Sequence, residues 1–301
     1  MQRKLIYLIN PISGTKGKSS LKELIASETS KRNIPFEILP TTANGDYSTV
    51  KHKIETEQVT DVVICGGDGT VNQVVKALAS TNVQFGIIPM GSGNGLALAA
   101  GIPKKSAKAL EIVFTGKAVL TDGFMVNEHF ACMLCGLGFD AQVAHQFADQ
   151  PKRGLGTYAS LTTRHFFNAK PYPFRVNANK LEFSTEAFFL SVANSNQFGN
   201  NFTIAPKAIL SDGLLDVVIV KKIAKPLLLL TVMRQVLAGR IRRIENSMSS
   251  PVIYFQTREL FISNPAEAPI HIDGEPWECQ RQLHIKVLPH YFKLIHAAAN
   301  A

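Results

Sequence analysis

The segment Gly66–Thr70 (GGDGT) follows directly on the apolar run Val62–Cys65 and constrains the fold more than any other feature of the chain. Apolar residues recur after it at spacings of three and four, which predicts an amphipathic helix starting near Val71. Glycines between a strand and a helix let backbone N–H groups and the helix N-terminus approach one anion without a clash of Cβ atoms. We therefore expect a strand, a turn and a helix that together bind a phosphate.

The same alternation of apolar runs with helical periods extends over the N-terminal part of the chain and is typical of a parallel sheet covered by helices. At about 150 residues per domain, the 301 residues suggest two domains. Residues 1–121 are predicted to form a nucleotide-binding α/β domain with glycine-rich loops. Residues 122–301 carry short alternating runs, which predicts a β-rich, sandwich-like domain. The expected strands include Leu5–Ile9, Phe36–Leu39, Val62–Cys65 and Gly86–Ile88 in the first domain and the run Arg175–Phe183 in the second.

The formal net charge of +9 gives the chain a field that attracts anions such as nucleotides, acidic lipid headgroups or nucleic acid. No helix-turn-helix or RNA-binding motif accompanies the charge, so nucleic acid is not an expected partner. The longest uncharged stretch, residues 77–103, is interrupted by glycines and Pro89, and no transmembrane helix is expected. The first apolar run is too short for a signal peptide, and the 4 cysteines are sparse, which together favour the cytosol.

Two further turns follow predicted strands, where open α/β sheets bind their ligands. In the first, Asn10–Gly14, the side chains of Asn10 and Ser13 and the free amide groups can face a phosphate, although an ordinary turn explains the same residues. In the second, Pro89–Gly95, Ser92 and Asn94 offer a hydroxyl and an amide to a nucleotide, and a flexible loop is the alternative. A carboxylate at Asp68 would repel a phosphate unless a cation such as Mg²⁺ lies between them.

These motifs in this order (NPxSG, GGDGT, PxGSGN) resemble the diacylglycerol kinase catalytic-domain family, which includes bacterial lipid kinases, sphingosine kinases and ceramide kinases. The resemblance covers nearly the whole chain. It continues in later segments that look like motifs of the family's second domain: Gly136–Ala141, Ala205–Pro206, Ser211–Val217 and Ile272–Pro276.

The resemblance implies that ATP and Mg²⁺ are the cofactors and that ATP lies between the two domains. It also implies that the chain after about residue 289 packs back on the first domain. The residues that match nucleotide-binding positions of the family are Asn10, Ser13, Gly14, Thr41, Gly66, Gly67, Asp68, Gly69, Thr70, Val71, Asn72, Gly91, Ser92 and Asn94. The resemblance further implies an acceptor hydroxyl on a membrane lipid, which residues 122–301 would bind as the lipid-substrate domain. It implies peripheral association with the inner face of the membrane. The sequence leaves open whether the protein forms a homodimer.

The resemblance also assigns catalytic and metal-binding positions. Glu275 matches the proposed general base, Asp122 matches an acidic position of the active-site network, and Asp68 could hold Mg²⁺ or act as the base instead. A structural Mg²⁺ is expected on the turn that contains Asp212. Its ligands would be the Asp212 carboxylate and the carbonyl groups of Ile209 and Leu214.

Three departures from the pattern bear on the acceptor. Ser92 and Gly95 stand where diacylglycerol kinases often carry Thr and Asp, and Gln73 replaces a frequent Glu. The Ser-x-Asn arrangement is closer to sphingosine and ceramide kinases. The acceptor is therefore expected to be a diacylglycerol-like or sphingosine-like lipid.

Two alternatives remain open. GGDGT also occurs in NAD kinases, and Asn127–Glu128 falls near the position of their Asn-Glu motif, although a hairpin turn is the simpler interpretation. A non-catalytic module that senses nucleotides or membranes would suit the apolar stretch Leu227–Met233 with its flanking cations, which are Lys221, Lys222, Lys225, Arg234, Arg240, Arg242 and Arg243.

Overall fold

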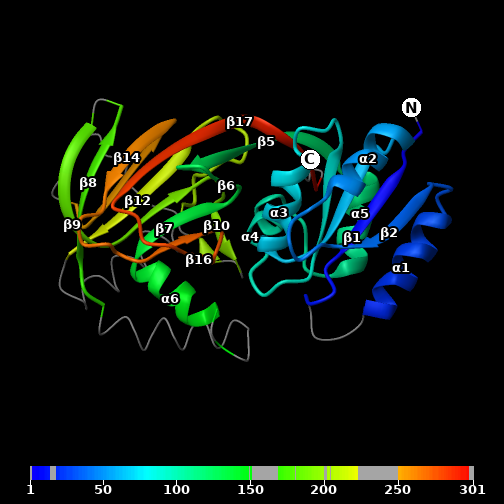
Figure 1. The fold of residues 1–301 in the computed structure, drawn as a ribbon, viewed down its shortest axis with the longest axis horizontal. Helices are drawn as coiled ribbons and strands as arrows, with labels where there is room; N and C mark the ends of the chain where they lie inside the picture. Colours follow the sequence, from blue (N-terminus) through cyan, green and yellow to red (C-terminus); the bar gives the residue numbers. More distant parts are fainter. Residues whose placement is uncertain are drawn as a thin grey trace. The chain divides into compact units, whose positions relative to one another are not determined.

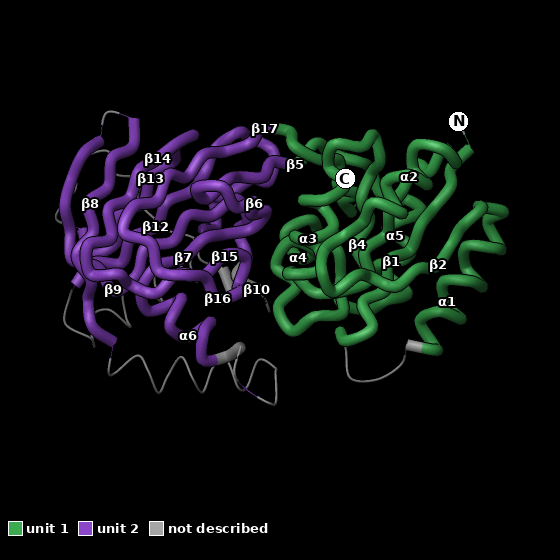
Figure 2. The backbone as a smooth tube through the Cα atoms, in the orientation of Figure 1, with its two compact units in different colours: residues 1–121, 290–301 green, residues 122–289 purple. Residues whose placement is uncertain are grey.

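The computed structural model describes residues 2–13, 18–148, 150, 169–179, 181–199, 202–203, 205–222 and 250–297 (Figure 1). The chain divides into two compact units, coloured separately in Figure 2. Unit 1 comprises residues 1–121 and 290–301, and unit 2 comprises residues 122–289. Unit 1 is therefore discontinuous in sequence. Some residues that entered the sequence predictions lie outside the described residues. They are Gly14, the segment Leu227–Met233 and the flanking cations Lys225, Arg234, Arg240, Arg242 and Arg243.

Unit 1 is built on a parallel sheet with the strand order β4-β3-β1-β2. Every residue of β1 and β3 is buried, as expected for central strands covered on both faces. The α/β prediction for the first domain is thus confirmed. The elements are β1 (Leu5–Ile9), α1 (Lys18–Ser30), β2 (Phe36–Pro40), α2 (Ser48–Glu57), β3 (Asp61–Gly66), α3 (Asp68–Leu78), β4 (Gln84–Pro89), α4 (Gly95–Ala99) and α5 (Ser106–Thr115).

The helix after β3 begins earlier than its apolar spacing predicts. Gly67 is extended, with φ of −94° and ψ of −175°, and its carbonyl accepts the N–H of Val71 at 3.0 Å. The first turn of α3 therefore starts at Asp68, and the expectation of a start near Val71 was wrong. Residues Asp68–Thr70 are polar or glycine, so an apolar period could not reveal them, although they form the turn that carries the positive end of the helix dipole.

Unit 2 is mainly antiparallel, which confirms the predicted β-rich second domain. Its strands run in the order β16-β15-β7-β9-β8-β14-β17, while β12 pairs with β9 and β13, and β5 with β6. The elements are β5 (Lys117–Val126), β6 (His129–Ala131), β7 (Leu134–Gly138), α6 (Phe139–Ala148), β8 (Tyr172–Ala178), β9 (Leu181–Ala193), β10 (Gln197–Gly199), β11 (Phe202–Thr203), β12 (Leu215–Lys221), β13 (Val252–Thr257), β14 (Glu259–Ser263), β15 (Ile270–Ile272), β16 (Glu275–Trp277) and β17 (Gln282–His296).

The run Arg175–Phe183, expected as one strand from its alternation, is divided between two strands. Arg175–Phe183 is not a single strand, because the chain turns at Asn179, with φ of 55°, between β8 and β9. The two strands then pair antiparallel, with Arg175 opposite Ser184. A short turn leaves the alternation of side chains almost unbroken, so the sequence alone does not mark it.

Strands β5 and β17 each continue from one unit into the other. Within unit 1, the last part of β17 lies parallel to β4, with Lys293 opposite Gln84 and Leu294 opposite Phe85. Phe292 packs edge-on against Phe85, with ring centroids 6.1 Å apart. In the part of the chain that the structure describes, no helix is both long and apolar enough to cross a bilayer.

Candidate active site

The three glycine-rich turns of unit 1 meet at one edge of its sheet. The strand register places Ile9 beside Cys65 and Cys65 beside Ile88, so the carboxyl ends of β1, β3 and β4 are level. Two backbone bonds join the turns, from the Asn10 amide to the Cys65 carbonyl and from the Met90 amide to the Gly66 carbonyl, both 2.9 Å long. This edge is where parallel α/β sheets bind their ligands.

Gly67 and Gly91 bring two of these turns into backbone contact. A Cβ atom at Gly91 would lie 2.6 Å from the Cα of Gly67, and one at Gly67 would lie 3.1 Å from the Cα of Gly91. Side chains at either position would therefore push the turns apart. A backbone cradle of this kind at a helix N-terminus suits the oxygens of a phosphate.

Asn10 ties the first turn to helix α3. Its side-chain amide donates to the Thr70 hydroxyl at 2.7 Å, while its oxygen accepts the N–H groups of Ile12 at 2.8 Å and Ser13 at 3.3 Å. The side chain thus fixes the shape of the turn and joins it to the GGDGT segment. Asp68, Gly69, Val71 and Asn72, also predicted to bind the nucleotide, lie in the first turns of α3.

Asn94 acts within its own loop. Its side chain accepts the Gly91 N–H at 2.8 Å and donates to the Gly91 carbonyl at 2.6 Å, and it is only 3 % exposed. Its backbone is left-handed, with φ of 59°, just before α4. Asn94 therefore shapes the loop that presents Gly91 and Ser92, and a direct contact of Asn94 with a nucleotide stays a prediction.

Gln73 joins α3 to the loop that follows β2, a role that sequence reasoning missed. With its amide oriented to satisfy its neighbours, the nitrogen donates to the Thr42 carbonyl at 3.2 Å and the Tyr47 hydroxyl at 3.1 Å, and the oxygen accepts the Gly45 N–H at 3.2 Å. The loop begins at Thr41, whose N–H donates to the Ile9 carbonyl at 3.1 Å. Gln73 stands where the family often has Glu. Its amide links α3 to this loop because it can both donate and accept hydrogen bonds.

In unit 2, Asp122 is fully buried and holds the turn that contains Asp212. Its carboxylate accepts the Gly213 N–H at 2.6 Å, and its own N–H donates to the Leu210 carbonyl at 2.7 Å. Burial and the nearby charge of Asp122 raise the pKa of Asp212 above its ordinary value. The turn therefore concentrates negative charge where the sequence predicts a cation.

The predicted Mg²⁺ ligands on this turn are one carboxylate and two carbonyl oxygens, which are the hard donors that Mg²⁺ prefers. The Leu214 N–H donates to the Asp212 carboxylate at 3.0 Å, while burial and the charge of Asp122 still raise its pKa, so a cation on this turn would offset unfavourable negative charge. Among the described side chains, no group of three His, Cys, Asp or Glu residues forms a metal cluster. The Ile209 and Leu214 carbonyls remain predicted ligands.

Glu275, the predicted base, is exposed on β16 directly after a tight hairpin turn. The turn residues Asp273 and Gly274 have φ of 51° and 84°, which suits the Asp-Gly sequence of a two-residue hairpin. The Asp273 carboxylate accepts the N–H groups of Cys132, Met133 and Leu134, each at 2.9 Å. One buried carboxylate therefore anchors the hairpin that presents Glu275.

A buried Asp140 and His271 pair lies behind the same hairpin. The Nε2 atom of His271 is 3.5 Å from the Asp140 carboxylate, and its Nδ1 atom accepts the Gly274 N–H at 3.3 Å. A Cβ atom at Gly136 would lie 2.1 Å from the Asp140 carboxylate and 2.3 Å from the His271 ring. The Gly136–Ala141 motif thus leaves room for a buried polar pair.

Asn194 connects Asp122 with the hairpin that carries Glu275, and no motif in the sequence pointed to it. It is fully buried, and its side-chain nitrogen donates to the carbonyls of Asp122 at 2.8 Å and Cys132 at 3.2 Å. Because Asp273 binds the Cys132 N–H, a continuous chain of bonds runs from Asp122 to the Glu275 hairpin. The only sequence signal was a polar residue immediately after the apolar run that forms β9.

Asn127 and Glu128, the basis of the NAD kinase alternative, form the turn of the β5–β6 hairpin, in which Val126 pairs with His129. The simpler interpretation of these two residues as a hairpin turn is therefore confirmed. Asn127 is bonded to β17 through its backbone and its side chain.

Comparison with family models supports this description of two units. Residues 4–126 match the diacylglycerol kinase catalytic domain, and residues 134–296 match the YegS C-terminal NAD kinase β-sandwich-like domain. The chain belongs to the YegS-like lipid kinase family. The family resemblance expected from the glycine-rich motifs is thereby confirmed.

Relatives with curated names agree with this assignment, and a solved structure shares the fold. The protein named "Probable lipid kinase YegS-like" from Shewanella frigidimarina is 28% identical over 245 residues, which cover 78% of this chain and 77% of that protein. Its namesake from Yersinia pestis is 28% identical over 254 residues, 82% of each chain. The crystal structure of a diacylglycerol kinase from Bacillus anthracis has the same fold, with a TM-score of 0.75 and 17% identity over 99% of this chain and 98% of that one.

Proposed function

We propose that this YegS-like kinase transfers the γ-phosphoryl group of ATP to the hydroxyl of a membrane lipid, either diacylglycerol-like or sphingosine-like. The backbone contact between Gly67 and Gly91 is the observation that carries the nucleotide half of the proposal. It explains why each of the two turns needs a glycine at the point where they meet beside the N-terminus of α3. Neither an ordinary turn nor a flexible loop requires that pairing.

The nucleotide half would act by position and charge. Backbone N–H groups of Gly67–Thr70 would donate to the phosphates from the start of α3, where the helix dipole favours negative charge. Asn10 and Gln73 keep the neighbouring loops in place. When bound, a Mg²⁺ ion held near Asp68 would supply further neutralisation of the phosphate charge, while the Asp212 turn would hold a structural Mg²⁺.

The acceptor half would activate the lipid hydroxyl. Glu275 accepts the proton of the hydroxyl as its oxygen attacks the γ-phosphorus, and the other product is ADP. The hairpin that presents Glu275 is anchored by Asp273, so the carboxylate has a defined place without being buried. Asp122 and Asn194 act as positioning residues for the same half.

Transfer of labelled γ-phosphate from Mg-ATP tests the proposal. Mixed micelles would contain diacylglycerol, sphingosine, ceramide or no lipid, and NAD would be assayed separately in solution. Label in one lipid supports the proposal and names the acceptor class. Label on NAD alone, or ATP binding without transfer to any acceptor, would refute it.

Two variants separate the candidate bases. Glu275→Gln should lower kcat at least 100-fold if Glu275 is the base. Asp68→Asn should instead mainly raise the concentration of Mg-ATP that the reaction requires. Glu278→Gln is a matched control, because Glu278 is an exposed glutamate three residues further along the chain.

We infer that the reaction takes place at a bilayer surface, because the proposed acceptor is a membrane lipid. The formal charge of +9 supports attraction to anionic headgroups. Sedimentation with vesicles of anionic and of zwitterionic lipid tests this inference. Equal binding to both at low salt would contradict it.

A further inference from the structure

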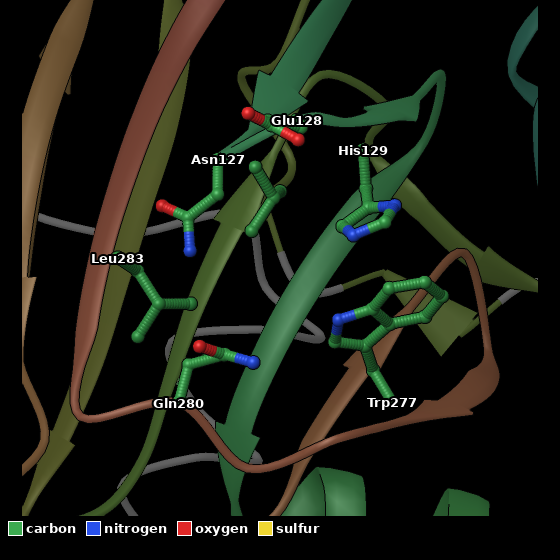
Figure 3. Close-up of a pocket in the computed structure, with 7 residues that line it drawn as sticks. Asn127, Glu128, His129, Trp277, Gln280 and Leu283 are labelled. Atoms are coloured by element: carbon green, nitrogen blue, oxygen red, sulfur yellow. The ribbon is translucent and has the colours of Figure 1, made fainter.

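A cavity of about 250 Å³ opens beside the hairpin of β5 and β6 in unit 2 (Figure 3). It is smaller than the pockets that enclose drug-sized ligands, and it has room for a headgroup but not for an acyl chain. Its walls come from three places in the chain, namely the β5–β6 hairpin, the segment from β16 onward and the start of β17. The lining residues are Val126, Asn127, Glu128, His129, Trp277, Gln280 and Leu283.

The walls of the cavity combine rings, polar groups and aliphatic side chains. The rings of His129 and Trp277 lie against each other, with centroids 3.9 Å apart and an interplanar angle of 55°. Figure 3 shows the indole nitrogen of Trp277 and the side-chain amide of Gln280 facing each other across the space. An indole N–H can only donate, and a carboxamide can donate and accept. These two groups therefore suit a ligand that carries hydroxyl or carbonyl oxygens.

The hairpin side of the cavity is held rigidly. The Asn127 N–H donates to the His284 carbonyl at 2.8 Å, and the Asn127 side-chain oxygen accepts the His284 N–H at 2.8 Å. The Asn127 side-chain nitrogen also donates to the Gln282 carbonyl at 3.3 Å. Because three bonds fix the tip of the hairpin to β17, the cavity exists before any ligand binds, which reduces the entropic cost of binding.

The charge of the lining distinguishes between ligand classes. None of the seven lining residues is Lys or Arg, and Glu128 is the single carboxylate among them. A phosphate would face the Glu128 carboxylate here and would find neither a Lys nor an Arg side chain. An uncharged group with several hydroxyl or ester oxygens would match the donors and rest against the indole face and the aliphatic walls.

The cavity also has a defined relation to Glu275. Glu275 and Trp277 are alternate residues of β16, so their side chains leave the same face of the strand about 6.6 Å apart. A headgroup resting against Trp277 can therefore present a neighbouring hydroxyl toward the Glu275 carboxylate. We propose that this cavity binds the uncharged, hydroxyl-bearing glycerol headgroup of the acceptor lipid, an inference that rests on the proposed lipid kinase function.

The fluorescence of Trp277 provides a direct test, because it is the only tryptophan in the 301 residues. The probes are short-chain dihexanoylglycerol below its micellar concentration, a short-chain sphingoid amine and inorganic phosphate, each titrated without ATP. We expect a saturable change with dihexanoylglycerol and none with phosphate. A response to phosphate, or tighter binding of the amine, would overturn the assignment to an uncharged headgroup.

Matched variants test whether the signal comes from this cavity. Gln280→Leu keeps the approximate volume and removes the polar amide, so it should weaken dihexanoylglycerol binding about tenfold. Gln282→Leu is the control, because Gln282 lies two residues away and is not part of the lining. Equal binding by both variants and the wild type would overturn the proposal. Glu128→Gln removes the carboxylate of the lining and should mainly weaken binding of the sphingoid amine. Glu278→Gln, outside the lining, should not.

A kinetic readout separates this proposal from the proposed function. In the micelle assay, Gln280→Leu should raise KM for diacylglycerol about tenfold and leave KM for ATP unchanged. If the wild type phosphorylates lipid while Gln280→Leu changes neither KM nor fluorescence, the cavity assignment fails and the kinase function stands. If the fluorescence titration behaves as expected but no lipid is phosphorylated, the cavity binds a headgroup and the kinase proposal fails.

Discussion

At the scale of single residues, Gly91 leaves no room for a side chain where its loop meets Gly67. In Gly91→Ala, the new Cβ atom would lie 2.6 Å from the Cα of Gly67, and backbone cannot give way as a flexible side chain can. We expect about 1–3 kcal/mol of lost stability, because overpacking forces the two turns apart. We also expect ATP affinity to fall at least tenfold, measured by equilibrium binding.

Gly86→Ala is the control for this prediction. Its Cβ atom would lie 2.9 Å from a methyl group of Val113, so it is crowded by a side chain and not by a ligand-binding turn. It should cost stability and leave ATP affinity almost unchanged. Equal loss of ATP affinity in both variants would show that the Gly67–Gly91 contact has no special role.

Asp212 gives a prediction that links pH, metal and stability. Burial and the charge of Asp122 raise its pKa, so the folded state binds the proton more tightly than the unfolded chain does. The stability from that proton is present below the ordinary pKa of an aspartate and is lost as pH rises through the raised pKa. Without Mg²⁺ at neutral pH, Asp212→Asn should therefore be at least as stable as the wild type, and this advantage should vanish in acid.

Addition of Mg²⁺ should reverse that order. At ten times the dissociation constant, the bound ion should stabilise the wild type by about 1.4 kcal/mol and Asp212→Asn hardly at all. Thermal unfolding with and without Mg²⁺ measures the difference, with Glu278→Gln as an exposed-acid control. The same gain in the wild type and in Asp212→Asn would exclude the turn as the metal site.

At the scale of elements, the link between α3 and the loop after β2 depends on an amide. Gln73→Glu keeps the shape of the side chain but cannot donate to the Thr42 carbonyl, and its charge faces that oxygen. We expect KM for ATP to rise about threefold to tenfold, because the loop after β2 is displaced. We expect kcat to stay nearly unchanged, because Glu275 and its hairpin are not affected. Gln58→Glu, an exposed glutamine in the same unit, should show neither effect. An unchanged KM in Gln73→Glu would mean that the loop does not depend on this link.

The elements also show what the sequence can reveal. Buried parallel strands followed by glycine-rich turns have a strong local signal, so β1, β3, β4 and the turns after them could be predicted. The start of α3 at Asp68 could not, because its first turn carries no apolar side chain. Asn194 and the Asp140–His271 pair were equally out of reach, since each joins segments far apart in sequence. A contact of that kind has no local pattern.

At the scale of the whole molecule, the last part of β17 completes the sheet of unit 1. Leu294 is fully buried beside β4, while its neighbour Lys293 is only half-buried and donates to the Asn82 side chain at 2.6 Å. Leu294→Ala should cost about 2–5 kcal/mol, because it opens a cavity in a packed core. Lys293→Ala should cost less than about 1 kcal/mol.

Hydrogen exchange on the full chain locates the effect of Leu294→Ala. Amides of β3 and β4 should lose protection, and ATP should restore part of it if the nucleotide binds unit 1. If β3 and β4 keep the protection that they have in the wild type, the segment after residue 290 is dispensable for unit 1.

The discontinuity of unit 1 has a consequence for synthesis on the ribosome. Residues 122–289 form one continuous unit, whereas unit 1 needs residues 290–297, which are translated about 170 residues after Thr121. At roughly 5–20 residues per second, that gap lasts on the order of 10–30 s. During this interval the first 121 residues have emerged with the β4 edge of their sheet unpaired. The nascent chain therefore completes its nucleotide-binding sheet only after the intervening unit has been translated, and a chaperone that covers an open strand edge would act in this interval.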